Sequence, residues 1–247
     1  MHDKFHDSAG VPWEGRQFEE NSWAQDDGSA PKQLADVLGA VTFDSVALFQ
    51  ALKNARLLIP LVAELGESGV GAHGQQVDKS ADLAIVAVST PDGKTAIPTF
   101  SSVAEMNKWN PAARPVPVSA VKAALAAASE GHERIVIDPA SSAVALRRPA
   151  LAALAQGFDW LPPHINPRVK ELISIAAVTQ PLITSVDLFD HDPTGRLEKA
   201  ELLIQLGMRP GITPDQLKAL LEGFNQELQT QEFLSLVDSI AMKIVVA

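Results

Sequence analysis

The sequence predicts an α+β protein with a mixed-sheet N-terminal domain and flanking helices, plus a smaller ββαβ C-terminal domain. Three observations support this. The chain has 247 residues, which exceeds one typical domain. Strand-like apolar runs alternate with capped helices along most of it. The stretch 157–163 holds two prolines and separates two sets of elements. The predicted parts are a flexible acidic arm over 1–33, a domain over 34–157 and a domain over 164–247.

The clearest local signal is a predicted hairpin. Leu83–Val88 is an apolar run of strand length, and Lys94–Phe100 resumes an extended pattern. Between them, Thr90–Gly93 reads Thr-Pro-Asp-Gly, in which proline presets the first corner and glycine accepts a positive φ. Pro98 cannot donate a ladder hydrogen bond, so we expect it on an edge strand or at a bulge.

A helix is predicted directly after this hairpin. Ser102 and Glu105 have the spacing of a capping box, and the Asn110-Pro111 pair ends the helix after Trp109. The other elements predicted for the N-terminal domain are mostly helix over 34–54, strand over 57–65, an extended piece over 114–118, an alanine-rich helix over 120–129 capped by Ser119, strands over 135–137 and 142–146, and a helix over 149–156.

Over residues 43–156 this order resembles the N-terminal domain of the SseB (enhanced serine sensitivity) family in its actinobacterial form. The segments that carry the resemblance are 57–62 (LLIPLV), 97–102 (IPTFSS), the helix ending near Trp109, 115–118 (PVPV), the alanine-rich helix and 135–141 (IVIDPAS). The family usually has asparagine where Asp138 stands and often glycine where Ala140 stands. The resemblance implies the fold and no reaction, because the family has no established activity.

A glycine pattern in the middle of this domain invites a nucleotide-binding interpretation. Gly69, Gly71 and Gly74 satisfy G-x-G-x-x-G, but that site needs a helix opening at the third glycine to hold the pyrophosphate. The residues after Gly74 are polar and lead into another strand. We therefore expect residues 69–79 to form a mobile loop between two strands that binds no nucleotide.

The C-terminal domain contains the sharpest motif of the chain. The loop from Asp190 to Glu201 has the oxygen spacing of a calcium-binding EF-hand. Its candidate metal ligands are Asp190, Asp192, Thr194 and Glu201. Pro181 and the alternation over 183–190 instead indicate a strand, and a second strand is predicted over 201–208. The hairpin interpretation, with Asp190 and Asp192 as solvated turn carboxylates and Glu198 and Glu201 on the acidic surface, is favoured over calcium binding.

The remaining C-terminal elements follow the same rules. Residues 167–179 can form a helix, and Thr213-Pro214-Asp215-Gln216 is the clearest helix start in the chain. The last strand is predicted over 239–246.

Composition narrows the functional classes. The chain has 20 basic and 30 acidic residues, which argues against binding a nucleic-acid backbone, and the absence of cysteine excludes thiol chemistry and disulfides. No apolar run reaches membrane-helix length and no apolar signal core opens the chain, so a cytoplasmic protein is expected.

No arrangement of base, nucleophile and oxyanion donor can be assembled from the sequence. The favoured function is a non-enzymatic interaction or regulatory module without a cofactor, whose partner is another protein, and a homodimer is left open. The alternative is a small-molecule or calcium-binding protein that uses the Asp138 turn or the Asp190–Glu201 loop. The ligand-binding candidates are Thr99, Phe100, Trp109 and Asp138.

Overall fold

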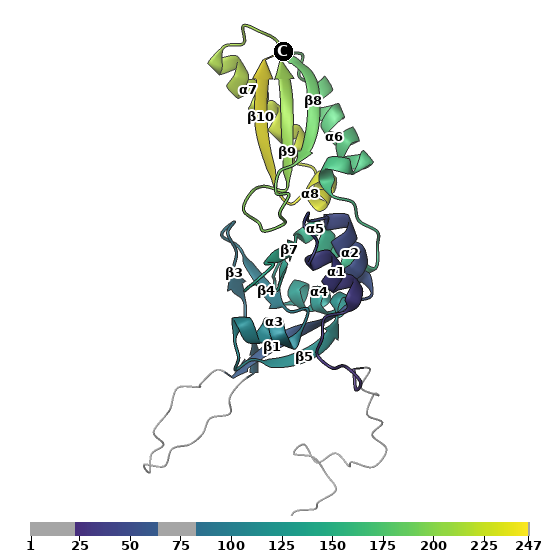
Figure 1. Ribbon diagram of the computed structural model, residues 1–247. Coiled ribbons are helices and arrows are strands. Elements are labelled where there is room, and N and C mark those ends of the chain that lie inside the picture. The colour runs from purple at the N-terminus through teal and green to yellow at the C-terminus, as the bar shows by residue number, and fades with distance from the viewer. Residues whose placement is uncertain (1–22, 64–82, 247) are drawn as a thin grey trace, which may run out of the picture.

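The protein consists of two units stacked end to end (Figure 1). A computed structural model describes residues 23–63 and 83–246. We call residues 23–157 the N-terminal unit and residues 163–246 the C-terminal unit, and residues 158–162 connect them. The two units have separate hydrophobic cores and share no sheet.

The N-terminal unit holds two small sheets. The first has the order β2-β1-β5 and is antiparallel, and the second has the order β3-β4-β6-β7. The strands are β1 (Arg56–Ala63), β2 (Leu83–Ile85), β3 (Val88–Ser89), β4 (Thr95–Thr99), β5 (Arg114–Ser119), β6 (Ile135–Ile137) and β7 (Val144–Leu146). The helices are α1 (Lys32–Leu38), α2 (Ser45–Lys53), α3 (Val103–Trp109), α4 (Ala120–Ser129) and α5 (Arg148–Gln156).

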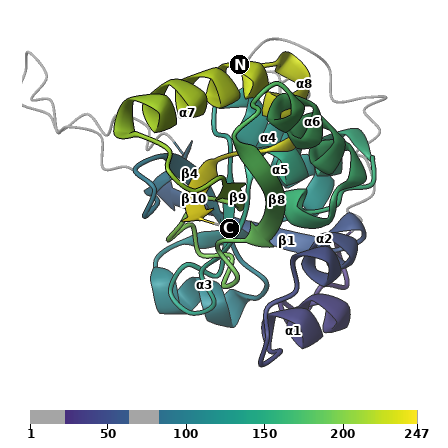
Figure 2. The ribbon, with the colours of Figure 1, turned by 90° about the horizontal axis from the view of Figure 1, so that it is seen from above.

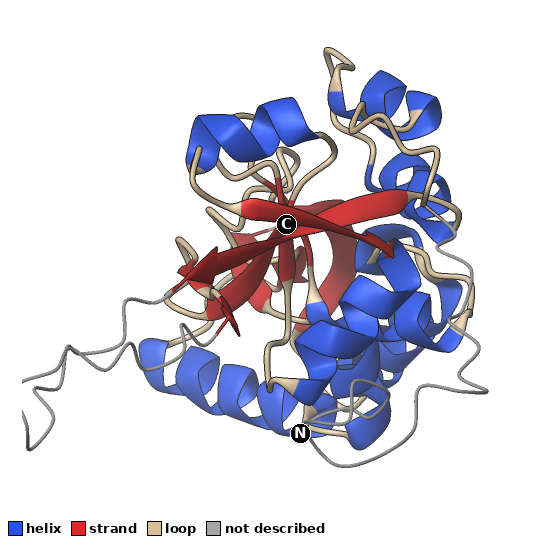
Figure 3. Cartoon of the chain, turned by 90° about the horizontal axis from the view of Figure 1, so that it is seen from below, coloured by secondary structure: helices blue, strands red, loops and turns tan. Residues whose placement is uncertain are grey.

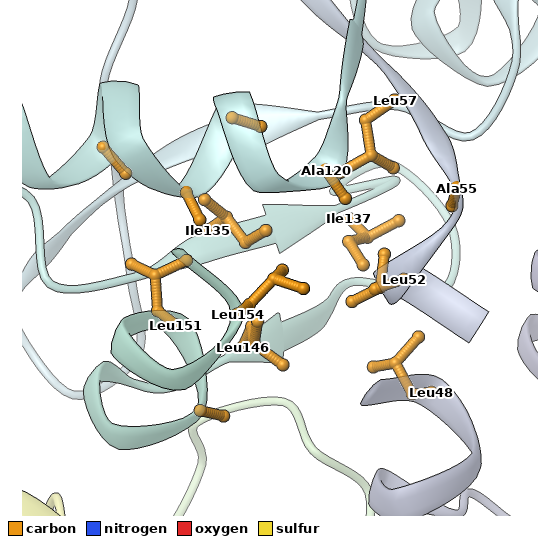
Figure 4. Close-up of a cluster of buried hydrophobic side chains, with 14 of the residues drawn as sticks. Leu48, Leu52, Ala55, Leu57, Ala120, Ile135, Ile137, Leu146, Leu151 and Leu154 are labelled. Atoms are coloured by element: carbon orange, nitrogen blue, oxygen red, sulfur yellow. The ribbon is translucent and has the colours of Figure 1, made fainter. Parts of the chain in front are cut away.

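Side-chain caps start the helices where the sequence predicts them. Ser102 accepts a hydrogen bond from the Glu105 backbone, and Ser119 accepts one from the Lys122 backbone. The buried faces of α2, α4 and α5 then meet β1, β4, β6 and β7 in one core. Figure 4 shows its centre, where Leu52, Ile135, Ile137, Leu146 and Leu154 point toward one another. This packing fixes the strand ends that carry the polar residues discussed below.

The predicted hairpin over 83–100 forms only at its tip. Gly93, at φ 79°, donates to Thr90 as the turn requires, and Val88 pairs with Ala96. The pairing then ends, and the beginning of the predicted strand joins β1 in the other sheet as β2. If the pairing of β3 with β4 continued in the same register, Pro98 would lie opposite Val86, where proline has no N–H to donate. Pro98 lies in β4, which has β3 on one side and β6 on the other, so the expected edge strand is wrong, and the pairing with β3 ends before Pro98.

The C-terminal unit is a three-stranded sheet backed by helices. Its strands β8 (Ile183–Asp190), β9 (Leu202–Met208) and β10 (Ile240–Val246) have the order β10-β9-β8, with β9 antiparallel to β8 and parallel to β10. Its helices are the 3₁₀ turn η1 (Pro163–Ile165), α6 (Pro167–Val178), α7 (Pro214–Leu228) and α8 (Gln231–Leu236). Figure 2 shows α6, α7 and α8 on one side of the strands. The Thr213 capping box is present, whereas the sequence analysis missed α8.

The α+β fold class is confirmed, since both units contain helices and strands (Figure 3). The division at 157–163 stays a prediction. Most of the arm over 1–33 and the glycine loop over 69–79 lie outside the described residues. The described end of the arm is held in place, because Asp26 pairs with the buried Arg56 and the Gly28 carbonyl accepts from Val103.

Candidate functional site

The turn at Asp138 ties two connections of the N-terminal unit together. Asp138 has a left-handed backbone, φ 50°, and its side chain is buried. Its carboxylate accepts hydrogen bonds from the backbone N–H of Ser101, at 2.8 Å, and from the Ser101 hydroxyl, at 2.6 Å. Burial raises the pKa of Asp138, although the two bonds from Ser101 oppose the rise. The carboxylate therefore joins the end of β6 to the start of α3.

The other ligand-binding candidates contribute to packing beside this turn. Thr99 is buried and donates its hydroxyl to the Val136 carbonyl. Phe100 lies in a small core with Met106, and its ring centroid is 5.4 Å from that of Trp109. Of the four candidates only Asp138 borders an open depression, of about 350 Å³, whose other polar side chains belong to Ser101, Ser102, Glu105, Ser141 and Ser142.

The loop between β8 and β9 connects two antiparallel strands, so the predicted hairpin is confirmed. Two expectations about its side chains are wrong. Asp192 and Glu201 were expected to be solvated, but they are only 6% and 8% exposed, while Asp190 and Glu198 are exposed as expected. The loop lies against the N-terminal unit, which covers both carboxylates.

A network of buried charges holds this loop and the N-terminal unit together; we call it the junction. The Asp238 side chain is fully buried, and its Oδ2 lies 2.7 Å from Arg134 and 3.2 Å from Arg147. Arg147 also contacts Asp192 at 2.6 Å, and Arg134 contacts Asp92 at 2.7 Å. Two arginines of one unit are thus neutralised largely by two aspartates of the other. Breaking such a buried pair leaves an uncompensated charge.

Apolar and backbone contacts complete the junction. Leu197 is buried in a cluster with Ala96, Val136 and Ala145, all from the N-terminal unit, although its φ of 62° is unusual for leucine. The Gly195 carbonyl accepts from the Ala145 backbone at 2.8 Å. A side chain at Gly195 would collide with the Phe43 ring, so glycine permits this close approach.

A narrow cavity of about 50 Å³ lies at the junction, with Asp190, Asp192 and Glu201 on its walls. Three of the four calcium candidates thus line this cavity, and the fourth, Thr194, donates its hydroxyl to Asp192 at 3.4 Å without lining it. A guanidinium of Arg147 already occupies the cationic position beside Asp192, and Glu201 accepts from the Asp238 backbone at 2.7 Å. Among the residues that the structure describes, no three His, Asp or Glu side chains are placed to hold a metal ion.

The pKa of the Glu201 carboxyl group is raised well above its usual value. Burial raises its pKa to about 7, and the nearby Asp238 carboxylate adds to the rise, while the Asp238 N–H and the guanidiniums of Arg147 and Arg148 oppose it. A carboxyl group that titrates near neutral pH is therefore enclosed between the two units.

An apolar groove of about 430 Å³ runs along the connection between the units, and we call it the linker groove. Its apolar walls come from the end of α5, from the connection itself and from α8; they comprise Pro149, Ala152, Ala153, Phe158, Trp160, Leu161 and Leu236. Phe158 is 62% exposed and Leu161 is 40% exposed. Trp160 packs on Phe49 in the core, with ring centroids 5.5 Å apart, and so fixes one wall.

Sequence reasoning missed the junction arginines and Asp238. Asp238 is 104 residues from Arg134 and 91 from Arg147, so no local pattern joins them. One usable signal was present, since the EF-hand-like spacing predicts an inward-facing residue at Leu197. That residue does face a core, but the core belongs to the other unit.

Comparison with known proteins gives one match. A family model described as "SseB protein N-terminal domain" matches residues 32–153. No curated protein and no solved structure matches the chain. In the described part of the chain, no helix combines the length and the apolar character needed to cross a membrane.

Proposed function

We propose, from the premise that residues 32–153 belong to the SseB family of N-terminal domains, that the chain is a non-enzymatic cytoplasmic module that binds another protein. The actinobacterial form of the family is part of this proposal. The observation that carries it is the linker groove, in which Phe158 is exposed beside further apolar walls. Exposed aromatic side chains in an apolar depression are typical anchors of protein–protein contacts.

The position of the groove suits a partner that engages both units. Its walls come from α5 and α8, and Arg148 on α5 donates to the Leu234 and Val237 carbonyls at the end of α8. The junction fixes the same two units by buried ion pairs. A bound segment would therefore meet a surface whose two sides are already positioned, which lowers the ordering cost of binding.

The proposed occupant is a short segment with two neighbouring large apolar side chains and an adjacent basic residue. The apolar side chains match the groove walls. The basic residue matches a chain of formal net charge −10, which attracts cationic partners over distance.

The test is site-specific photocrosslinking in the native cell from position 158, compared with position 218. Lys218 is exposed on α7 and does not line the groove. We expect an adduct that is specific to position 158. A synthetic peptide from the captured segment should then bind the purified full chain. Phe158→Ser should weaken this binding at least tenfold, because it removes the main exposed anchor.

Leu125→Ser is the matched control, because Leu125 is another exposed large apolar residue and lies on α4, where it does not line the groove. It should leave peptide binding unchanged. Identical adducts from positions 158 and 218, or equal losses in the two serine variants, would contradict the proposal.

The alternative is a small-molecule or calcium-binding protein. The depression beside Asp138 supports it, because its volume suits a small ligand and Ser101, Ser102 and Glu105 surround it. We rank it second, because the Asp138 carboxylate is already held by two hydrogen bonds from Ser101. Binding of a ligand there would be lost in Glu105→Gln, whereas the linker-groove peptide would bind that variant normally.

A further inference from the structure

The C-terminal sheet has one face that no described helix covers. Leu202, Ile204 and Leu206 of β9 point into the core with α6 and α7. Side chains alternate along a strand, so Leu203 and Gln205 point the other way. Figures 1 and 2 show the described helices of this unit only behind the strands. We call the uncovered side the open face.

The open face carries its charges at opposite edges. The pairing of β8, β9 and β10 places Asp187, Gln205 and Lys243 in one row across the sheet. Asp187 and Lys243 are exposed, and within the described residues neither takes part in an ion pair. The row therefore runs from negative at β8 to positive at β10.

In a second row the side chains become smaller from β8 to β10. It consists of Phe189, Leu203 and Ala241, again in register across the three strands. Phe189 is 45% exposed at the β8 edge, and the small Ala241 stands at the β10 edge. On the open face, the β8 edge thus carries a large side chain and a negative one. The β10 edge carries a small side chain and a positive one.

We propose that two copies of this chain pair through the open face about a two-fold axis parallel to β9. This operation exchanges the two edges of the facing sheet. Asp187 then meets Lys243 of the second copy, Phe189 meets Ala241 of the second copy, and Leu203 lies on the axis. A two-fold interface needs a surface that is complementary to itself, and both rows have this property. The inference does not depend on the linker groove.

The dimensions fit a weak dimer. Facing sheets pack about 10 Å apart, a gap that a lysine and an aspartate side chain span together. The seven residues of the central strand β9 and the width of three strands give a face of roughly 23 Å by 14 Å. This area is below the usual range of specific interfaces, so we expect a weak dimer that forms only with rising concentration.

The test uses sedimentation velocity of the full chain from about 5 to 500 μM. Asp187→Lys alone places two lysines against each other across the interface, and Lys243→Asp alone places two aspartates there. Each single variant should therefore dimerise at least tenfold more weakly. An equimolar mixture of the two single variants, and the double variant D187K/K243D, should both recover dimerisation, because opposite charges face each other again.

Recovery of dimerisation in the mixture distinguishes the proposed interface from a role of Asp187 and Lys243 in preventing aggregation. Isolated charges on edge strands also discourage aggregation, but that role predicts no recovery in the mixture. A second measurement uses the absence of cysteine from the chain. Gln205→Cys with a bis-maleimide of about 10 Å span should give a covalent dimer, since the axis passes beside this position. Asp36→Cys, at an exposed position on α1, is the control.

The proposal is overturned if the full chain stays monomeric throughout the concentration range. It is also overturned if both single variants dimerise like the wild type, if mixing them restores nothing, or if Gln205→Cys crosslinks no better than Asp36→Cys.

Discussion

Replacing Glu201 by glutamine is expected to flatten part of the pH dependence of stability. The folded protein raises the pKa of Glu201 from 4.5 to about 7. Since one pKa unit corresponds to about 1.4 kcal/mol, the difference amounts to roughly 3 kcal/mol. The folded state binds this proton more tightly than the unfolded state. The contribution of Glu201 is therefore fully present below about pH 4.5 and is lost as the pH rises through about 7.

Urea unfolding of the wild type and of Glu201→Gln at pH 5, 6, 7 and 8 measures this effect. Glutamine cannot ionise, so the variant should gain up to roughly 2–3 kcal/mol relative to the wild type between pH 5 and pH 8. Glu198→Gln is the matched control, because Glu198 lies in the same loop but is exposed. Its stability difference from the wild type should not change over this range. Parallel curves for the wild type and Glu201→Gln would refute the reasoning.

Three further predictions concern the junction. Asp238→Ala removes the carboxylate that two buried guanidiniums share and leaves them mainly Asp92 and Asp192, so it should cost roughly 3–5 kcal/mol in urea unfolding, whereas the exposed Asp36→Ala should cost less than about 0.5 kcal/mol. Equal costs would show that the junction carries little stability. Leu197→Ala should cost roughly 2–5 kcal/mol and increase proteolysis near residues 157–163, because it empties the contact between the units; unchanged proteolysis would contradict this. Isothermal titration with millimolar calcium should show no stoichiometric binding, because Arg147 already pairs with Asp192. A transition that Glu201→Gln abolishes would show that this loop binds calcium and would contradict the prediction.

The sequence predicts well what neighbouring residues determine. Ser102, Ser119 and Thr213 each cap the helix that their spacing indicates. The strand alternation before Asp190 and the strand predicted after Glu201 correctly indicate the hairpin that the structure contains. The cap hydrogen bonds join residues 3 positions apart, and the strand alternation is visible within a few neighbouring residues, so a local pattern contains the information.

The errors arise where a distant partner decides. Asp192 looks like a surface carboxylate until the stacking of the units brings Arg147 beside it. Glu201 looks like one until the pairing of β9 with β10 brings Asp238 beside it. The split of the strand over 83–88 depends on Pro98 and on the competing edge of β1. The candidate site at Asp138 was located correctly as a turn, but its bond to Ser101 crosses 37 residues.

The junction stays incomplete for part of the time in which the chain is synthesised. Arg134 and Arg147 leave the ribosome long before Asp238, which follows Arg134 by 104 residues. At about 5–20 residues per second, the N-terminal unit waits roughly 5–20 s for Asp238. Arg134 keeps its pair with Asp92, but Arg147 has no carboxylate partner until the C-terminal unit is made. During this interval the small apolar surface around Ala145, later covered by Leu197, is also open. The nascent chain therefore presents a cationic, partly apolar surface that the finished protein conceals, and premature termination within the C-terminal unit would leave it exposed.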